Sequence, residues 1–169
     1  CDVGELIRLD HIQKLLDDGK GQESDPDVGA VMMGWMFARC DEGVKLGNEW
    51  ICHSKYVQDD HAADPFDAFT KPTNNRSMLY FCQMMECIQG TEWAEKVPKE
   101  LPLYNIAGDQ DPCGNYGEGL YHVANLLART GNKTITRAYT GYRHEIHNEL
   151  AIRDEVEAGL IEFVNQVLG

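Results

Sequence analysis

Residues 101–112, LPLYNIAGDQDP, and residues 133–149, KTITRAYTGYRHEIHNE, decide the fold class of this chain. Each stretch begins with a short apolar or alternating run that is typical of a β-strand. A helical pattern that ends at Gly131 separates the two runs, and strands that are joined through a helix run parallel. The expected order is strand 101–107, helix 116–129, strand 133–139 and helix 149–168. The sequence therefore predicts an α/β fold.

The last of these helices keeps one apolar face along its whole length, which predicts that it covers one face of the sheet. The residues of this face are Ile152, Val156, Leu160, Phe163, Val164 and Val167. A parallel strand pair needs both of its faces buried and further strands beside it. Other strands are not evident in the sequence, so we expect exposed edges, and with them aggregation or a partner.

The portion before Pro98 has a different pattern. Helical spacing of leucine and isoleucine predicts a helix over 5–18, and the stretch VGAVMMGWMFAR at 28–39 predicts a helix that is buried or that flanks a ligand cavity. Apolar spacing predicts a third helix over 78–88. The segment 48–75 between them carries scattered aspartates and two prolines, and we expect it to be irregular.

An acid and a histidine, Asp111 and His144, follow the two predicted strands. The reactive groups of open parallel sheets gather at the carboxyl ends of the strands. A buried carboxylate that accepts the imidazole Nδ1 proton leaves Nε2 free to act as a general base. The alternative is structural: Asp111 starts a turn before Pro112, and His144 caps a loop. On these two residues alone, the structural alternative is the more common outcome.

Composition limits the class of protein. The net charge of −13 disfavours binding to nucleic acid or to an anionic membrane surface. No apolar run reaches the length of a transmembrane segment, and no signal peptide is recognisable. The six cysteines form no C-x-x-C pair. Reduced thiols and a cytoplasmic location are therefore predicted.

Patterns for metals and cofactors fail on inspection. A calcium loop that starts at Asp109 would place Leu120 where a bidentate glutamate is needed. His144 and His147 are three apart rather than four, and a zinc site with Glu145 between them would lack a third ligand. No phosphate-binding glycine motif is present. The sequence predicts no cofactor and no metal.

The strings LPLYNIAGDQDPCGNYGEGL and YTGYRHEIHNE resemble the acid and histidine segments of one α/β-hydrolase family. That family includes monoacylglycerol lipases, lysophospholipases and serine aminopeptidases. The resemblance is specific over 99–168. It is weaker over 48–66, where NEW and DPF resemble pieces of the family's cap, and it is loose over 1–47.

The resemblance implies a role for each matching residue. The second aspartate of the family's G-D-x-D-P-x-G segment, its triad acid, maps onto Asp111. The histidine of R-H-E-x-x-N-E maps onto His144, and Asp109 is left to support the turn. The implied organisation is a helical cap over 1–97 and the last two strands and helices of an α/β-hydrolase core over 98–169. Cap side chains that would line an acyl pocket, or else simply pack helices together, are Met32, Met33, Trp35, Met36, Phe37, Met78, Phe81 and Met85.

The implied function is cleavage of carboxylic, lipid-like esters through an acyl-serine intermediate. The family's nucleophile and oxyanion hole precede its cap, and the three serines, Ser24, Ser54 and Ser77, lack a G-x-S-x-G surround. We therefore expect an N-terminal half that is not in this sequence, either in the same protein or as a second chain, and no activity from this chain alone. Two alternatives remain: a non-catalytic binding module with an apolar cap pocket, and an unorthodox Ser54 nucleophile.

Overall fold

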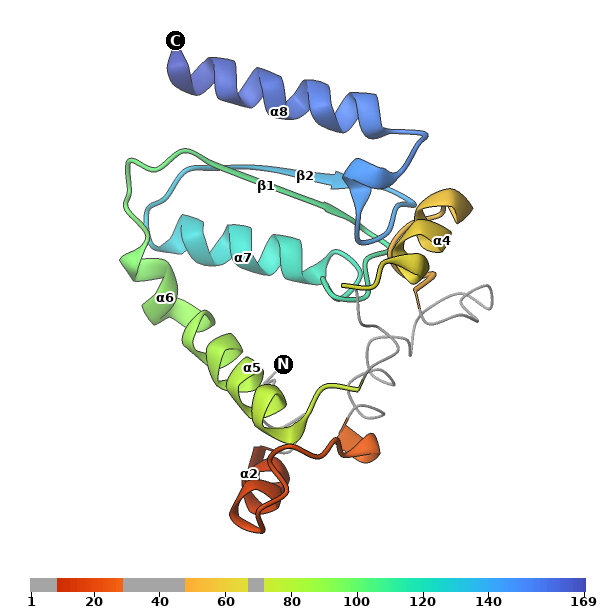
Figure 1. Cartoon of the computed structure of the whole chain (residues 1–169). Helices are drawn as coiled ribbons and strands as arrows, with labels where there is room; N and C mark the ends of the chain where they lie inside the picture. The colour runs from red at the N-terminus through yellow and green to blue at the C-terminus, as the bar shows by residue number, and fades with distance from the viewer. Residues whose placement is uncertain (1–8, 29–47, 67–71) are drawn as a thin grey trace.

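The computed structural model describes residues 9–28, 48–66 and 72–169 (Figure 1). The elements in chain order are helices α2 (Leu9–Asp17), α4 (Lys55–Ala63), α5 (Asn75–Cys87) and α6 (Gly90–Lys96), strand β1 (Leu103–Gly108), helix α7 (Glu118–Arg129), strand β2 (Thr134–Tyr139), the 3₁₀ helix η1 (Ile146–Asn148) and helix α8 (Arg153–Leu168). None of the helices within these ranges is long and apolar enough to cross a membrane.

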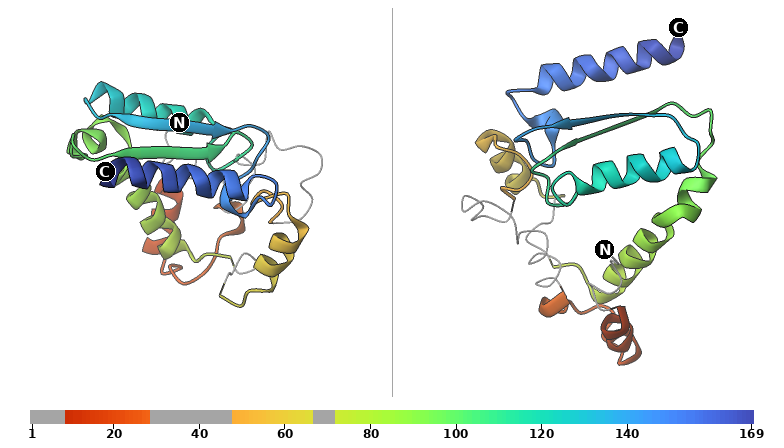
Figure 2. Two further views of the ribbon diagram at one scale, coloured as in Figure 1. Left: turned by 90° about the horizontal axis from the view of Figure 1, so that it is seen from above. Right: turned by 180° about the vertical axis from the view of Figure 1, so that it is seen from behind.

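The two strands pair in parallel, with Leu103 opposite Thr134 and Gly108 opposite Tyr139. Helix α7 makes the crossover between them, and Figures 1 and 2 show α7 on one face of the sheet and α8 on the other. The predicted α/β fold with two parallel strands and flanking helices is therefore confirmed. Because the strands are parallel, the segments that follow β1 and β2 leave the sheet at the same edge.

Separate small cores hold the layers together. Between α6, α7 and β1 lie the buried residues Ala94, Leu126 and Leu127 with Leu103 against them. Between β2 and the start of α8 lie Tyr139, Ile146, Ile152 and Val156. Helix α2 packs against α5 through Ile12, Met78, Leu79 and Cys82. The core between β2 and α8 thus supports the carboxyl edge of the sheet.

The predicted apolar face of α8 is only partly buried. Val156 is fully buried, whereas Leu160, Val164 and Val167 remain 40–48% exposed. Tyr104 of β1 stacks on Phe163 with ring centroids 5.2 Å apart. Helix α8 covers one face of the sheet, as predicted. Because the described sheet has two strands, the surface beneath the helix is narrow, and part of the apolar face of the helix stays exposed.

Several elements differ from the sequence prediction. Segment 48–75 is not irregular throughout, because Ser54 accepts the Val57 N–H and caps α4. Helix α6 was not predicted. Helix α7 starts at Glu118 instead of residue 116, because Asn115 and Tyr116 have left-handed backbones with φ of 48° and 55°.

The predicted N-terminal helices have mixed outcomes. The one over 5–18 is confirmed where it is described, as α2, and the one over 78–88 is confirmed within α5. The segment from residue 29 to 39 lies outside the described residues, and with it five of the candidate acyl-pocket side chains. Of the others, Met78 packs between helices, and Phe81 is 44% exposed.

Candidate active site

The site is built on the two segments that follow the strands. Asp111 lies in the turn after β1, and His144 lies in the loop after β2. The carboxylate of Asp111 is almost buried, with 9% of its side chain exposed, whereas 39% of the His144 side chain is exposed. The structure thus brings together the two residues predicted from the sequence, at the carboxyl edge of the sheet. We call them the acid–histidine pair.

The carboxylate faces one nitrogen of the imidazole ring. His144 Nδ1 lies 3.1 Å from Asp111 Oδ1 and 3.1 Å from Oδ2. A proton on Nδ1 satisfies this contact and leaves Nε2 as the nitrogen that can accept a proton. The hydrogen bond to Asp111 raises the pKa of His144, and the partial burial of the ring opposes this shift.

Local hydrogen bonds orient Asp111. Its Oδ1 accepts the backbone N–H of Cys113 at 2.9 Å, and its own carbonyl accepts the N–H of Tyr116 at 2.8 Å. The second bond closes a turn in which Asn115 and Tyr116 adopt left-handed conformations, which carry a strain of about 1 kcal/mol or more each. The acid is therefore fixed by contacts within its own turn.

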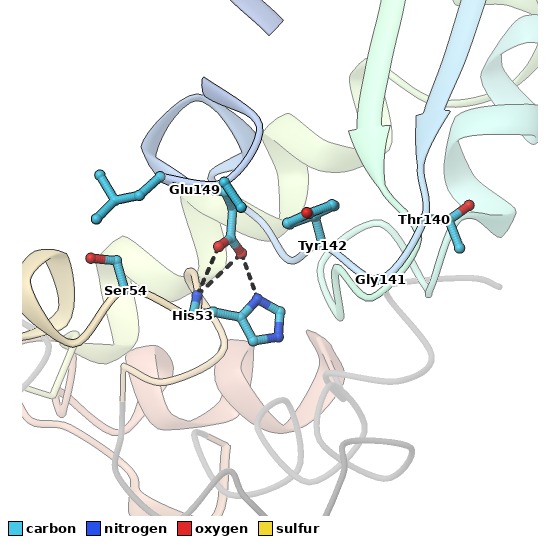
Figure 3. Close-up of a pocket in the computed structure, with 8 residues that line it drawn as sticks. His53, Ser54, Thr140, Gly141, Tyr142 and Glu149 are labelled. Carbon is cyan, nitrogen blue, oxygen red and sulfur yellow. Dashed lines mark hydrogen bonds and ion pairs between the residues drawn. The ribbon is translucent and has the colours of Figure 1, made fainter. Parts of the chain in front are cut away.

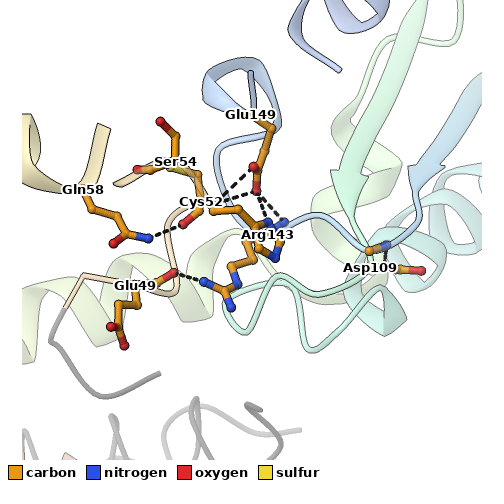
Figure 4. Close-up of polar contacts among 9 residues, drawn as sticks. Glu49, Cys52, Ser54, Gln58, Asp109, Arg143 and Glu149 are labelled. Atoms are coloured by element: carbon orange, nitrogen blue, oxygen red, sulfur yellow. Dashed lines mark hydrogen bonds and ion pairs between the residues drawn. The ribbon is translucent and has the colours of Figure 1, made fainter. Parts of the chain in front are cut away.

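A second aspartate joins the two segments. Asp109 Oδ1 accepts the backbone N–H of Gly141 at 2.7 Å (Figure 4). The Asp109 N–H donates to the carbonyl of Tyr139, the last residue of β2. This is the turn-supporting position that the resemblance implied for Asp109.

The close approach of the segments depends on a glycine at the end of β1. A Cβ atom at Gly108 would overlap the backbone carbonyl oxygens of Tyr142 and Arg143. Since backbone atoms cannot turn aside as a side chain does, only glycine fits here. The residues before His144 therefore pass directly over the end of the strand that carries the acid.

Residues 48–54 pack on the loop that holds His144. The Trp50 ring lies 4.9 Å from the His144 ring, centroid to centroid. The Ile51 carbonyl accepts the Glu145 N–H at 2.8 Å, and Arg143 Nη1 donates to the Glu49 carbonyl at 2.6 Å (Figure 4). His144 is thus held from both sides, by the sheet edge and by a segment far away in sequence.

A second carboxylate–histidine contact lies beside the first. Glu149 is 2% exposed, and its Oε1 lies 2.9 Å from His53 Nδ1 (Figure 3). Its oxygens also accept the backbone N–H of His53 at 3.1 Å and that of Arg143 at 3.4 Å. We call Glu149 and His53 the clamp pair. An open pocket of about 480 Å³ adjoins it, lined by His53, Ser54, Thr140, Gly141, Tyr142, Glu149, Leu150 and Ala151.

Sequence reasoning missed Trp50, Cys113 and the clamp pair. The signal for Glu149 was present, because it closes the R-H-E-x-x-N-E segment, but nothing in the sequence links it to His53. Cys113 is an exposed residue, but its sulfur is partly shielded from water. Burial around the sulfur and the charge of Asp111 raise its pKa to about 12. This thiol stays protonated at neutral pH.

Ser54 lines the open pocket beside the clamp pair, whereas Ser24 and Ser77 are not among its lining residues. Ser54 caps α4, Ser77 lies in the first turn of α5, and Ser24 donates to the Pro72 carbonyl. No hydrogen bond joins any of the three to His144 within the described ranges.

Two solved structures resemble the chain. One is a highly thermostable carboxyl esterase from Bacillus coagulans in complex with glycerol, with a TM-score of 0.87 and 53% identity over 95% of this chain. The other is a lipase in an open form, with a TM-score of 0.86 and 29% identity over 96% of this chain. The chain spans 52% of each of these structures. No protein-family model and no curated protein matches.

Proposed function

We propose that the chain is the acid- and histidine-bearing part of an α/β-hydrolase that cleaves carboxylic esters through an acyl-serine intermediate. The observation that carries this proposal is the symmetric contact of His144 Nδ1 with both Asp111 oxygens. It lies at the sheet edge where such reactions are expected. The resemblance to a carboxyl esterase and a lipase supports the same reaction class.

In the proposed mechanism, Asp111 holds the Nδ1 proton and so fixes the tautomer of His144. Nε2 takes the proton from a serine hydroxyl as that oxygen attacks the ester carbonyl. The same proton then passes to the alcohol that leaves, and a water repeats the cycle to release the acid. Stabilisation of the tetrahedral oxyanion requires donors in addition to this pair.

We place the serine and the oxyanion-hole donors outside these 169 residues, in a part of the protein that precedes them or in a second chain. The absence of a hydrogen bond between His144 and any described serine supports this placement. On this account, residues 98–169 belong to the hydrolase core and residues 1–97 form a cap. The proposed substrates are lipid monoesters, as in the family that the acid and histidine segments resemble.

The proposed location is the cytoplasm. It is supported by the described cysteines, since Cys52, Cys82, Cys87 and Cys113 are all free.

The test is fluorophosphonate labelling of an active preparation that contains this chain, followed by intact mass of every polypeptide present. We expect the label on a serine outside these residues and its loss in His144→Ala. His147→Ala is the matched control, because this exposed histidine lies three residues further on, in the 3₁₀ helix η1. Label on Ser24, Ser54 or Ser77 would overturn the placement of the nucleophile, and no label in the wild type would favour a binding module.

A further inference from the structure

Three different ligand types meet at the acid–histidine pair. Asp111, Cys113 and His144 each offer one ligand atom, and these atoms all lie within 4.8 Å of one another. Asp111 is buried, whereas Cys113 and His144 are exposed residues.

The trio has the chemistry of a zinc site. Zn²⁺ binds thiolate sulfur at about 2.3 Å and imidazole nitrogen or carboxylate oxygen at about 2.0–2.2 Å. In a tetrahedral arrangement, these bond lengths separate the ligand atoms by about 3.3–3.8 Å. The nitrogen and the carboxylate already lie 3.1 Å apart. The three ligand atoms lie within 4.8 Å of one another, so Cys113 Sγ has to move toward the other two atoms by up to about 1 Å.

Two of the three ligands, Asp111 and His144, are held in place before any ion binds. Asp111 and Cys113 belong to one turn, in which the Cys113 N–H donates to Asp111 Oδ1 at 2.9 Å. The ring of His144 is packed against Trp50. Little ordering is therefore needed on binding, and the net charge of −13 favours the approach of a cation.

We propose that Asp111, Cys113 and His144 form a binding site for a zinc-like divalent cation. Binding replaces the S–H bond of Cys113 with a metal–sulfur bond, and that proton goes to solvent. The cation takes Nδ1 of His144, the nitrogen that faces Asp111, so the single proton of the neutral ring moves to Nε2. A water fills the fourth position.

This site would switch off the proposed reaction, and that consequence rests on the proposed function. A ring with its proton on Nε2 cannot accept a proton from a serine, and a carboxylate bound to the metal no longer orients the ring. The cation would act as a reversible inhibitor that competes with the general base, not as a cofactor. The binding itself does not depend on any enzymatic activity.

Calorimetric titration of the chain with Zn²⁺ alone tests the site, with Cys113→Ala as the main variant. We expect one tight site in the wild type and at least about a tenfold loss of affinity in Cys113→Ala, since even outer-shell partners of a metal contribute that much. Cys87→Ala is the matched control, because Cys87 is an exposed thiol at the end of α5, and its affinity should equal that of the wild type.

Equal affinities in the wild type and Cys113→Ala would overturn the proposal, as would a loss of similar size in Cys87→Ala. His144→Ala gives a second test, because it removes a ligand through a different and exposed side chain. Circular dichroism of each variant shows that the fold is kept. Zinc binding by the chain that needs Cys113, together with no fluorophosphonate label in a preparation of the complete protein, would contradict the proposed function and leave this site standing. Esterase activity of the complete protein without zinc binding would contradict this site and leave the proposed function standing.

Discussion

The acid–histidine pair and the clamp pair are alike in their contact and different in their surroundings. In both, a buried carboxylate lies about 3 Å from the Nδ1 of a half-exposed imidazole. Asp111 accepts one backbone N–H, from its own turn. Glu149 accepts backbone N–H groups of His53 and Arg143, which belong to two segments far apart in the chain.

If the proposed function holds, the difference teaches that a buried carboxylate beside a histidine does not by itself mark a catalytic pair. Glu149 joins residues 48–54 to the His144 loop. Its hydrogen bonds to two backbone N–H groups stabilise the main chain of both segments. Asp111 gives most of its hydrogen-bonding capacity to the ring. The acid–histidine pair also follows the two strands directly, where a substrate can approach, and this position separates the two roles.

The largest expected contrast is in turnover. We expect Asp111→Asn to lower kcat about 10⁴-fold, as the corresponding change does in a serine protease, because the amide favours the wrong tautomer of His144. Glu149→Gln keeps an acceptor oxygen for the backbone and should lower kcat less than about tenfold. Steady-state hydrolysis of a soluble ester by an active preparation measures both. Equal losses would remove the distinction between the pairs.

Stability should show the opposite order. Glu149→Ala leaves the N–H groups of His53 and Arg143 without this acceptor, which costs about 1–3 kcal/mol of unfolding free energy. Asp111→Ala should cost less, because one backbone N–H loses its partner. Urea unfolding of the chain gives the two values, with the exposed Glu157→Ala expected within about 0.5 kcal/mol of the wild type. A larger loss for Asp111→Ala than for Glu149→Ala would contradict the assignment of roles.

The smallest expected effect is a shift in titration. The hydrogen bond to Asp111 is the main cause that raises the pKa of His144, and burial opposes it. Asp111→Asn should therefore lower the pKa of His144, which NMR of the ring protons measures. Activity that needs neutral His144 should rise as pH increases through the raised pKa of the wild type.

The dependence of stability on pH has the opposite sign to that of activity. A histidine whose folded pKa is raised stabilises the fold fully below its unfolded pKa, and this contribution is lost as pH rises through the folded pKa. Asp111→Asn should flatten this part of the stability profile. An unchanged His144 titration in the variant would mean that the carboxylate does not control the ring.

The strands and the acid–histidine pair could be predicted because their signals are local. Alternation marks β2, and the rule that functional groups follow parallel strands needs only chain order. The clamp pair could not be predicted, because Glu149 and His53 are separated by 96 positions. The third metal ligand was missed for a related reason, since Cys113 joins the pair through the path of the turn.

The missed helices also have physical causes. Helix α4 buries Gln58 and no apolar residue, so it has no apolar stripe from which a period can be read. Helix α6 has seven residues, too few to define a period. The Ser54 cap stabilises α4, and the burial of Ala94 against α7 stabilises α6, and these contacts outweigh the weak local pattern.

Gly108 sets a limit on how this site can be redesigned. Substitutions around most functional residues fail because a side chain is lost, but here the space is occupied by the main chain of the facing loop. No compensating change in another side chain can create room for a methyl group. When the acid and histidine segments are exchanged by recombination or loop grafting, the two segments must therefore be transferred together, and the acid segment must keep Gly108.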